Sequence, residues 1–143
     1  MVMMRGVAVP VMAISLALLG CSTMRPATPP PTGLMWAYRA EAEALPSLHM
    51  IFYATDRATC ELNRAKDVHQ PPKDIAWVGL KITSECRQIA VGSGGDFWVF
   101  AASPQEATGA PDRDWCLKMR DGLEKTRGRV FGNCQPVAIK NVQ

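Results

Sequence analysis

The side chains with the most evident chemistry in this sequence are four cysteine thiols, Cys60, Cys86, Cys116 and Cys134. Such thiols can pair as disulfides, bind zinc as thiolates or act as nucleophiles. All four lie in repeated motifs. D-R-x-x-C occurs at residues 56–60 and 112–116, and C-x-x-[IV]-A-[VI] occurs at residues 86–91 and 134–139.

The repeat predicts how the cysteines pair. In each half, a cysteine near the start of a helical segment is followed by a cysteine at the start of a strand. Four cysteines allow three pairings. Only the pairing Cys60–Cys86 with Cys116–Cys134 treats the halves alike, so we predict these two disulfides. Chance similarity between two short motifs is the alternative interpretation.

Zinc binding and thiol catalysis fit the sequence less well. It has no C-x-x-C pair, and His49 and His69 lie far from metal-ligand spacing with any cysteine, so we expect no metal and no cofactor. A nucleophilic thiol would need to stay reduced and to have a neighbouring base. We can assemble no nucleophile, base and orienting group, so we expect no catalytic residues. A small periplasmic enzyme with an unrecognised site is the alternative.

A fifth cysteine, Cys21, follows an apolar segment. Arg5 is the only charged residue among the first twenty, and residues 6–19 carry no charge, which is typical of a secretory signal. The segment is too short for a permanent membrane span, which needs about 20 apolar residues. Its end, Leu18-Leu19-Gly20-Cys21, resembles the lipobox of bacterial lipoprotein precursors.

This resemblance implies cleavage before Cys21, a diacylglyceryl group on its sulfur and acylation of the new amino terminus. The alternative is an ordinary signal peptide with an incidental cysteine, but such a site has small residues both one and three positions before the cut. Ser22 stands where an aspartate would favour inner-membrane retention in enteric lipoproteins. We therefore expect a lipid anchor in the bacterial outer membrane, with the domain in the oxidising periplasm.

Composition divides the chain into three parts. Residues 1–20 form the expected signal peptide, residues 21–33 a lipidated, proline-rich extended tether, and residues 34–143 a single domain with a modest core. The mature chain has 15 basic residues against 13 acidic ones, a net charge of +2. This balance and the compartment argue against a nucleic-acid partner. The expected partners are the membrane, through the lipid, and an envelope protein or peptidoglycan.

Hydrophobic patterning and capping signals predict the elements of the domain. We expect strands at residues 48–54, 86–91, 97–101 and 135–142, and helices from Thr55 or Asp56 to about residue 67 and from Asp112 or Asp114 to about residue 126. Residues 92–96 are predicted as a hairpin turn and residues 103–112 as a loop. Residues 34–45 are rich in helix formers and predicted as a helix, with an entering strand as the alternative.

The order strand, helix, strand, strand, helix, strand predicts an α+β fold. We expect a four-stranded antiparallel sheet with two helices on one face, as in ferredoxin-like βαββαβ folds, and two disulfides. This order is similar to that of sporulation-related repeat domains, small envelope modules that bind the glycan strands of peptidoglycan. The resemblance makes peptidoglycan binding an alternative, by analogy of fold. The main prediction is a non-enzymatic, lipid-anchored envelope binding module.

Two further groups of residues could bind a partner. Trp98 lies between Phe97 and Phe100 in sequence and could stack on a sugar, although a place in the core is the simpler interpretation. A basic cluster could meet anionic glycan or lipid, but its place near a helix carboxyl end favours a solvated face. The cluster comprises Lys118, Arg120, Lys125, Arg127 and Arg129.

Overall fold

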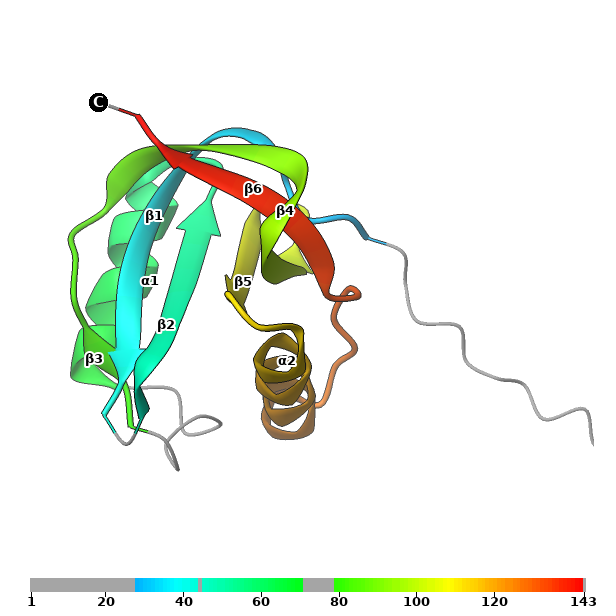
Figure 1. Ribbon diagram of the computed structural model, residues 1–143. Helices are drawn as coiled ribbons and strands as arrows, with labels where there is room; N and C mark the ends of the chain where they lie inside the picture. Colours follow the sequence, from blue (N-terminus) through cyan, green and yellow to red (C-terminus); the bar gives the residue numbers. More distant parts are fainter. Residues whose placement is uncertain (1–27, 44, 71–78, 143) are drawn as a thin grey trace, which may run out of the picture.

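The computed structural model describes residues 28–43, 45–70 and 79–142 of the chain. These residues form an α+β domain in which one antiparallel sheet is accompanied by two helices (Figure 1). The expected signal peptide, Cys21, the proline pair at residues 71–72 and Trp77 lie outside the described residues.

The described residues contain six strands and two helices. The strands are β1 (Gly33–Ala42), β2 (Leu45–Ala54), β3 (Lys81–Ile82), β4 (Arg87–Ser103), β5 (Glu106–Ala110) and β6 (Gln135–Asn141). The helices are α1 (Arg57–His69) and α2 (Arg113–Arg127). The strand order is β3-β1-β2-β5-β4-β6.

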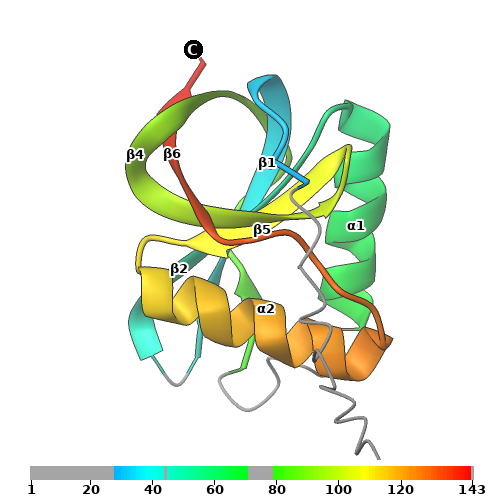
Figure 2. The ribbon, with the colours of Figure 1, turned by 90° about the vertical axis from the view of Figure 1, so that its right-hand side faces the viewer.

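The sheet closes into a barrel, so the expected open ferredoxin-like sheet is wrong. Besides its other neighbours, β1 pairs with the first part of β4, which joins β1, β2, β5 and β4 into a ring. Figure 2 shows β4 curving round the barrel with β6 along it. The helices also do not share one face: α1 packs on β1, β2 and β3, whereas α2 packs on β4 and β5.

Closure depends on residues 92–96, which bend β4 instead of reversing the chain as expected. The partner strand β6 pairs with β4 on both sides of this bend, and the register shifts between Ser93 and Phe97. The backbone of Gly95 lies so close to β6 that a Cβ there would be 2.5 Å from the carbonyl oxygen of Val137. Glycine therefore permits a bend in which one long strand serves both halves of the barrel.

Two other segments also differ from their predictions. Residues 34–45, predicted as a helix, belong mainly to β1, as the alternative held, and residues 106–110, predicted as loop, form β5. In β1, pairing with three other strands buries Met35, Ala37 and Ala40. Tertiary pairing thus overrides the weak helix preference of the alanines and glutamates.

The predicted helix caps are confirmed. Asp56 and Asp112 are the N-cap residues, and each side chain accepts a hydrogen bond from the backbone N–H three residues on, of Thr59 at 2.8 Å and of Trp115 at 3.1 Å. Gly128 ends α2 in the left-handed conformation. These contacts satisfy backbone groups that a helix end leaves without partners.

The two halves of the domain are related by an approximate two-fold axis. In the pairing of β2 with β5, Phe52 stands opposite Thr108, with the pairs Ile51–Gly109 and Tyr53–Ala107 on either side. Cys60 and Cys116 are 56 positions apart in the sequence. The same shift takes Ile51 to Ala107 and Tyr53 to Gly109, so it exchanges the two flanking pairs. The axis therefore passes between Phe52 and Thr108.

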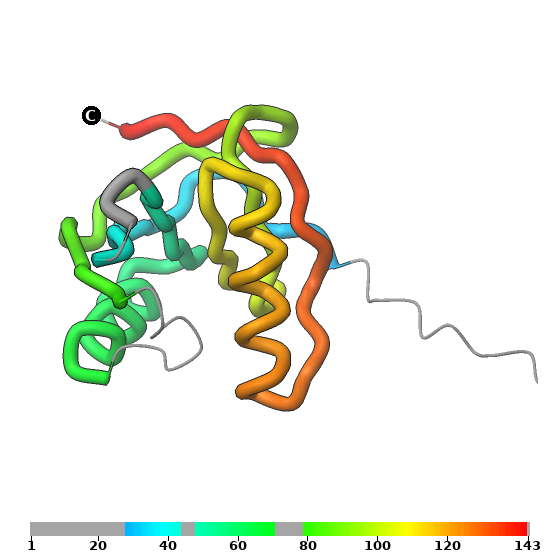
Figure 3. The backbone as a smooth tube through the Cα atoms, turned by 60° about the horizontal axis from the view of Figure 1, so that its bottom comes forward, coloured from blue at the N-terminus to red at the C-terminus, as the bar shows by residue number. Residues whose placement is uncertain are grey.

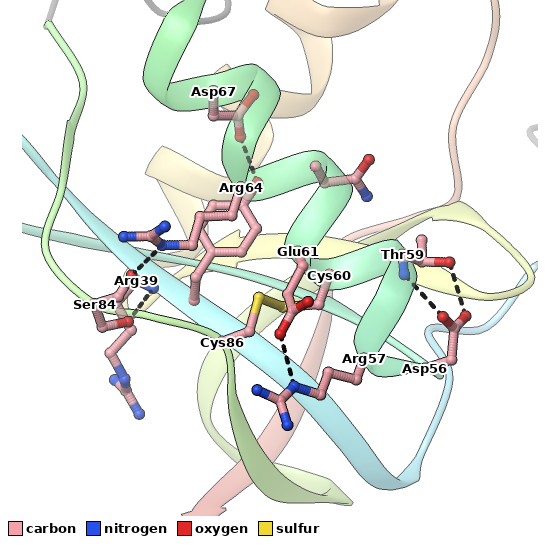
Figure 4. The surroundings of a disulfide bond; sticks show 12 residues. Arg39, Asp56, Arg57, Thr59, Cys60, Glu61, Arg64, Asp67, Ser84 and Cys86 are labelled. Carbon is pink, nitrogen blue, oxygen red and sulfur yellow. Dashed lines mark hydrogen bonds and ion pairs between the residues drawn. A yellow bond between two sulfur atoms is a disulfide. The ribbon is translucent and has the colours of Figure 1, made fainter.

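The symmetry extends to the disulfides. The bonds Cys60–Cys86 and Cys116–Cys134 have the predicted pairing, and the Cα atoms are 6.2 Å apart in both. Figure 4 shows the first of them between the start of α1 and the segment entering β4. Each bond ties the first turns of a helix to the residue just before a strand, β4 for Cys86 and β6 for Cys134, as expected for equivalent halves.

The arginine of the repeated D-R-x-x-C motif has an equivalent role in each half. The guanidinium of Arg57 lies 5.2 Å from the ring centre of Trp36, and that of Arg113 lies 5.5 Å from that of Trp98. Each motif thus supplies a helix cap, a cation over a tryptophan and a cysteine for the disulfide.

The domain begins earlier than the expected boundary at residue 34. Gly33 already belongs to β1, Pro30 is buried, and the Tyr53 hydroxyl donates a hydrogen bond to the carbonyl oxygen of Pro31 at 3.2 Å. The described end of the expected tether, residues 28–32, therefore packs on the domain. Its prolines fit this role because they carry little conformational entropy to lose.

Removing residues 28–32 should lower the free energy of unfolding of the domain by about 1–3 kcal/mol, because Pro30 burial and the Tyr53 hydrogen bond are lost. Urea denaturation of chains beginning at residues 28 and 33 measures the difference. Tyr53→Phe is the control: it should destabilise the longer chain more than the shorter one. Equal stability of the two chains would contradict this packing.

Candidate functional site

A cavity of about 300 Å³ lies between the two helices on the α1 side of the domain. Both β2 and β5 contribute to its wall near the two-fold axis, through Phe52 and Thr108. Its other polar and charged lining residues come from β1, β2, α1, β5 and the end of α2 with the segment that follows it. They are Tyr38, Tyr53, Asn63, Lys66, Asp67, Glu106, Arg127 and Arg129.

The deepest polar pair in the cavity is Tyr38 with Asp67. Tyr38 is 2 % exposed and stacks on Phe52, with 5.1 Å between ring centres, and its hydroxyl donates a hydrogen bond to Asp67 Oδ2. Figure 4 shows Asp67 directed from α1 toward this hydroxyl. Burial, with the Asp67 charge as the next cause, strongly raises the pKa of Tyr38, so the phenol remains a hydrogen-bond donor.

Asp67 balances opposing effects. Burial raises the pKa of its carboxyl group, whereas the hydrogen bond from Tyr38 and the charges of Arg127 and Lys66 act to lower that pKa. The net shift is upward. The carboxylate is thus held where its charge is poorly solvated, and a cationic ligand group would relieve that cost.

A second carboxylate lies in the same cavity. The side-chain amide of Asn63 donates a hydrogen bond to Glu106 Oε1, and the Ser103 hydroxyl donates one to Glu106 Oε2 at 3.2 Å. Glu106 begins β5, whereas Asn63 lies one helical turn before Asp67 on α1. Two acidic groups from different elements therefore converge on one space.

Three cations stand at the rim. Lys66, Arg127 and Arg129 are exposed and line the cavity. Figure 3 shows the segment after α2 running back along that helix. The Arg129 guanidinium donates a hydrogen bond to the carbonyl oxygen of Ala102 at 3.3 Å and lies 4.8 Å from the ring centre of Phe131. The rim is thus positive above a wall that is acidic.

Comparison of the two halves shows how unusual this cavity is. Under the two-fold relation, four polar residues of the cavity have apolar equivalents. Tyr38 is equivalent to Phe100, Asn63 to Met119, Asp67 to Leu123 and Glu106 to Met50. All four apolar counterparts are buried and belong to one core cluster under α2. At four pairs of equivalent positions, the side chains around the cavity beside α1 are therefore polar, whereas those under α2 form an ordinary core.

The basic cluster expected on one helix face is divided in the structure. Arg127 and Arg129 lie at the cavity, whereas Lys118 lies over the Trp115 ring, 4.5 Å from its centre, and Arg120 pairs with Asp121 at 3.0 Å. A single solvated face thus describes only part of the cluster.

The other sequence candidates lie away from the cavity. Trp98 is partly buried beside the core and covered by Arg113, so it is not the exposed stacking surface considered as one interpretation. His49 Nδ1 lies 3.4 Å from Glu41 Oε1 in an exposed position. Among the described residues, no group of three or more histidine, cysteine or acidic side chains could hold a metal ion.

The polar lining of the cavity was missed in the sequence, although a signal for it was present. Aligning the two helices on Cys60 and Cys116 places Asn63 and Asp67 opposite Met119 and Leu123. Extending the repeat past its motif would therefore have shown two polar residues at core positions of one helix.

No family model, curated protein or solved structure matched this chain when it was compared with known proteins. None of the helices among the described residues is long and apolar enough to cross a membrane. The fold and site therefore define the class of protein by themselves: a disulfide-linked α+β barrel of two equivalent halves, with a polar cavity beside α1 that both halves line.

Proposed function

We propose that this protein is a lipid-anchored cell-envelope binding module, held at the bacterial outer membrane through Cys21, whose small ligand occupies the cavity between α1 and α2. The observation that carries the proposal is the polar set Tyr38, Asn63, Asp67 and Glu106, whose symmetry equivalents form the apolar core under α2. Burying polar groups costs stability unless they are compensated, so a ligand that they bind gives a reason for them.

The hydrogen bonding favours binding over catalysis. Both carboxylates are fixed by neutral donors, and the Tyr38 hydroxyl is itself a donor whose raised pKa makes it a poor nucleophile or base. Cys60, which lines the cavity, is in a disulfide and has no free thiol. Positioned acceptors of this kind suit the recognition of a ligand, so we assign the protein no enzymatic activity.

The anchor would hold the cavity close to the membrane. Only six residues separate Cys21 from Thr28, where the described domain begins. Fully extended, the seven steps from Cys21 to Thr28 span at most about 25 Å. A ligand or partner at the inner surface of the outer membrane is therefore within reach, and an envelope protein and peptidoglycan glycan remain competing partners.

Converting the cavity to the residues of the other half should abolish binding and stabilise the domain. We expect the triple variant Tyr38→Phe/Asn63→Met/Asp67→Leu to raise the free energy of unfolding by about 1–4 kcal/mol, because apolar residues replace partly buried polar ones. Urea denaturation measures this change. Amide chemical shifts, recorded with pools of amino acids, dipeptides and sugars, measure binding.

Glu61→Gln on the exposed side of α1 is the matched control and should keep the binding of the unmodified protein. Shifts that fall outside the cavity, or that persist in the triple variant, would show that the ligand binds elsewhere. A triple variant less stable than the unmodified domain would contradict the claim that these three residues occupy positions suited to a core.

A further inference from the structure

The inner wall of the cavity has more free acceptors than donors. The Tyr38 hydroxyl and one N–H of Asn63 are already used on the two carboxylates. Within the described part of the chain, Asp67 Oδ1 and Asn63 Oδ1 make no hydrogen bond, and a carboxylate accepts bonds but donates none. The end of a ligand that faces this wall must therefore bring hydrogen-bond donors.

The rim has the opposite character. The charged groups of Lys66 and Arg127 make no hydrogen bond or ion pair with any described residue, although both charges act to lower the pKa of the Asp67 carboxyl group. Ammonium and guanidinium groups donate hydrogen bonds and accept none. The outer end of the ligand must therefore be an acceptor, and an anion fits best.

The charge of the wall decides between an ammonium group and hydroxyl groups. A hydroxyl would fill the acceptors but leave the poorly solvated negative charge of Asp67, whereas an ammonium group supplies three N–H donors together with a compensating charge. The cavity volume of about 300 Å³ equals that of about ten water molecules in the liquid, so both ends belong to one small molecule.

Building on the proposed function, we infer that the ligand is a small zwitterion of the amino-acid or short-peptide class. Its ammonium group is bound by Asp67, Asn63 and Glu106, and its carboxylate by Arg127 and Lys66. The stacked rings of Tyr38 and Phe52 also line the cavity and form its apolar wall.

The test uses the full mature chain with Cys21→Ala, titrated by calorimetry and amide chemical shifts with four small probes. Alanyl-alanine carries both charged ends, N-acetyl-alanine lacks the ammonium group, alaninamide lacks the carboxylate, and glucuronate is an acidic sugar. We expect alanyl-alanine to bind in the cavity at least tenfold more tightly than each of the others.

Two variants assign the ends of the ligand. Asp67→Asn should weaken alanyl-alanine about 10- to 100-fold and leave N-acetyl-alanine unchanged, whereas Arg127→Gln should weaken alanyl-alanine by a similar factor and leave alaninamide unchanged. Asp114→Asn and Lys125→Gln, exposed residues of α2 outside the cavity, are the matched controls and should keep the affinity of the unmodified chain.

The outcomes separate this inference from the proposed function. Glucuronate binding in the cavity while alanyl-alanine fails to bind would overturn the zwitterion and leave a binding module for acidic sugars. Equal binding of alanyl-alanine and alaninamide would overturn the role of Arg127 and Lys66. If no probe, and none of the pooled amino acids, dipeptides and sugars, perturbs the cavity, both proposals fail.

Discussion

Replacing Cys21 with alanine should release essentially all of the protein from the membrane fraction and abolish its labelling by a fatty-acid probe. The reason is the number of acyl chains that the lipobox resemblance implies. One myristoyl chain binds membranes only reversibly, and each buried CH₂ adds about 0.8 kcal/mol, so a diacylglyceryl group plus an amide-linked chain gives stable anchoring. Without the sulfur of Cys21, there is no attachment point for the diacylglyceryl group.

Metabolic labelling of cells that express either form, followed by fractionation of the cells, measures this effect. Cys60→Ala/Cys86→Ala is the matched control, because it removes two cysteines from the folded domain and should leave labelling and fractionation unchanged. If Cys21→Ala protein still labels and still partitions with membranes, the anchor and the outer-membrane location are both wrong.

Removing the second disulfide should lower the free energy of unfolding by about 2–5 kcal/mol. The bond closes a segment of 18 residues in sequence separation, and Cys116 is fully buried in the core cluster with Phe100 and Met119. The double variant Cys116→Ala/Cys134→Ala thus loses a cross-link and part of a packed core. Urea denaturation measures the change, and non-reducing peptide mapping checks that Cys60–Cys86 still forms.

The first disulfide provides the comparison. Its sequence separation is 26, and Cys60 lines the cavity, so Cys60→Ala/Cys86→Ala should weaken ligand binding as well as stability. Loss of the second bond should change stability alone. Finding Cys60 joined to Cys116 or Cys134, or four free thiols in periplasmic protein, would contradict both the pairing and the equivalence of the halves.

Local chemistry explains which features could be predicted from the sequence. The caps at Asp56 and Asp112 and the stop at Gly128 depend on a few neighbouring backbone groups, so their residue types are sufficient signals. The cysteine pairing follows from the repeat if each half closes its own bond, because only Cys60–Cys86 with Cys116–Cys134 does so. The α+β class, the two helices and the two disulfides follow from these signals.

The closure of the sheet was decided by tertiary structure. A glycine-rich segment between two β-rich runs is compatible with a tight hairpin turn and with a bend in one continuous strand. The bend forms because two long-range pairings stabilise it: β6 pairs with β4 on both sides of the bend, and β1 pairs with the first part of β4. Such long-range pairing also makes residues 33–42 a strand despite their helix-forming composition.

The candidate site depends on the sequence and on the tertiary structure together. The sequence by itself determines that one half has Asn63 and Asp67 where the other has Met119 and Leu123, and that Cys21 follows a signal-like segment. Only the tertiary structure brings Tyr38, Glu106 and Arg127 to the same space, because they come from β1, β5 and α2. A helix pattern reports which residues share a face, whereas the strands and helix opposite that face are set by barrel closure and packing.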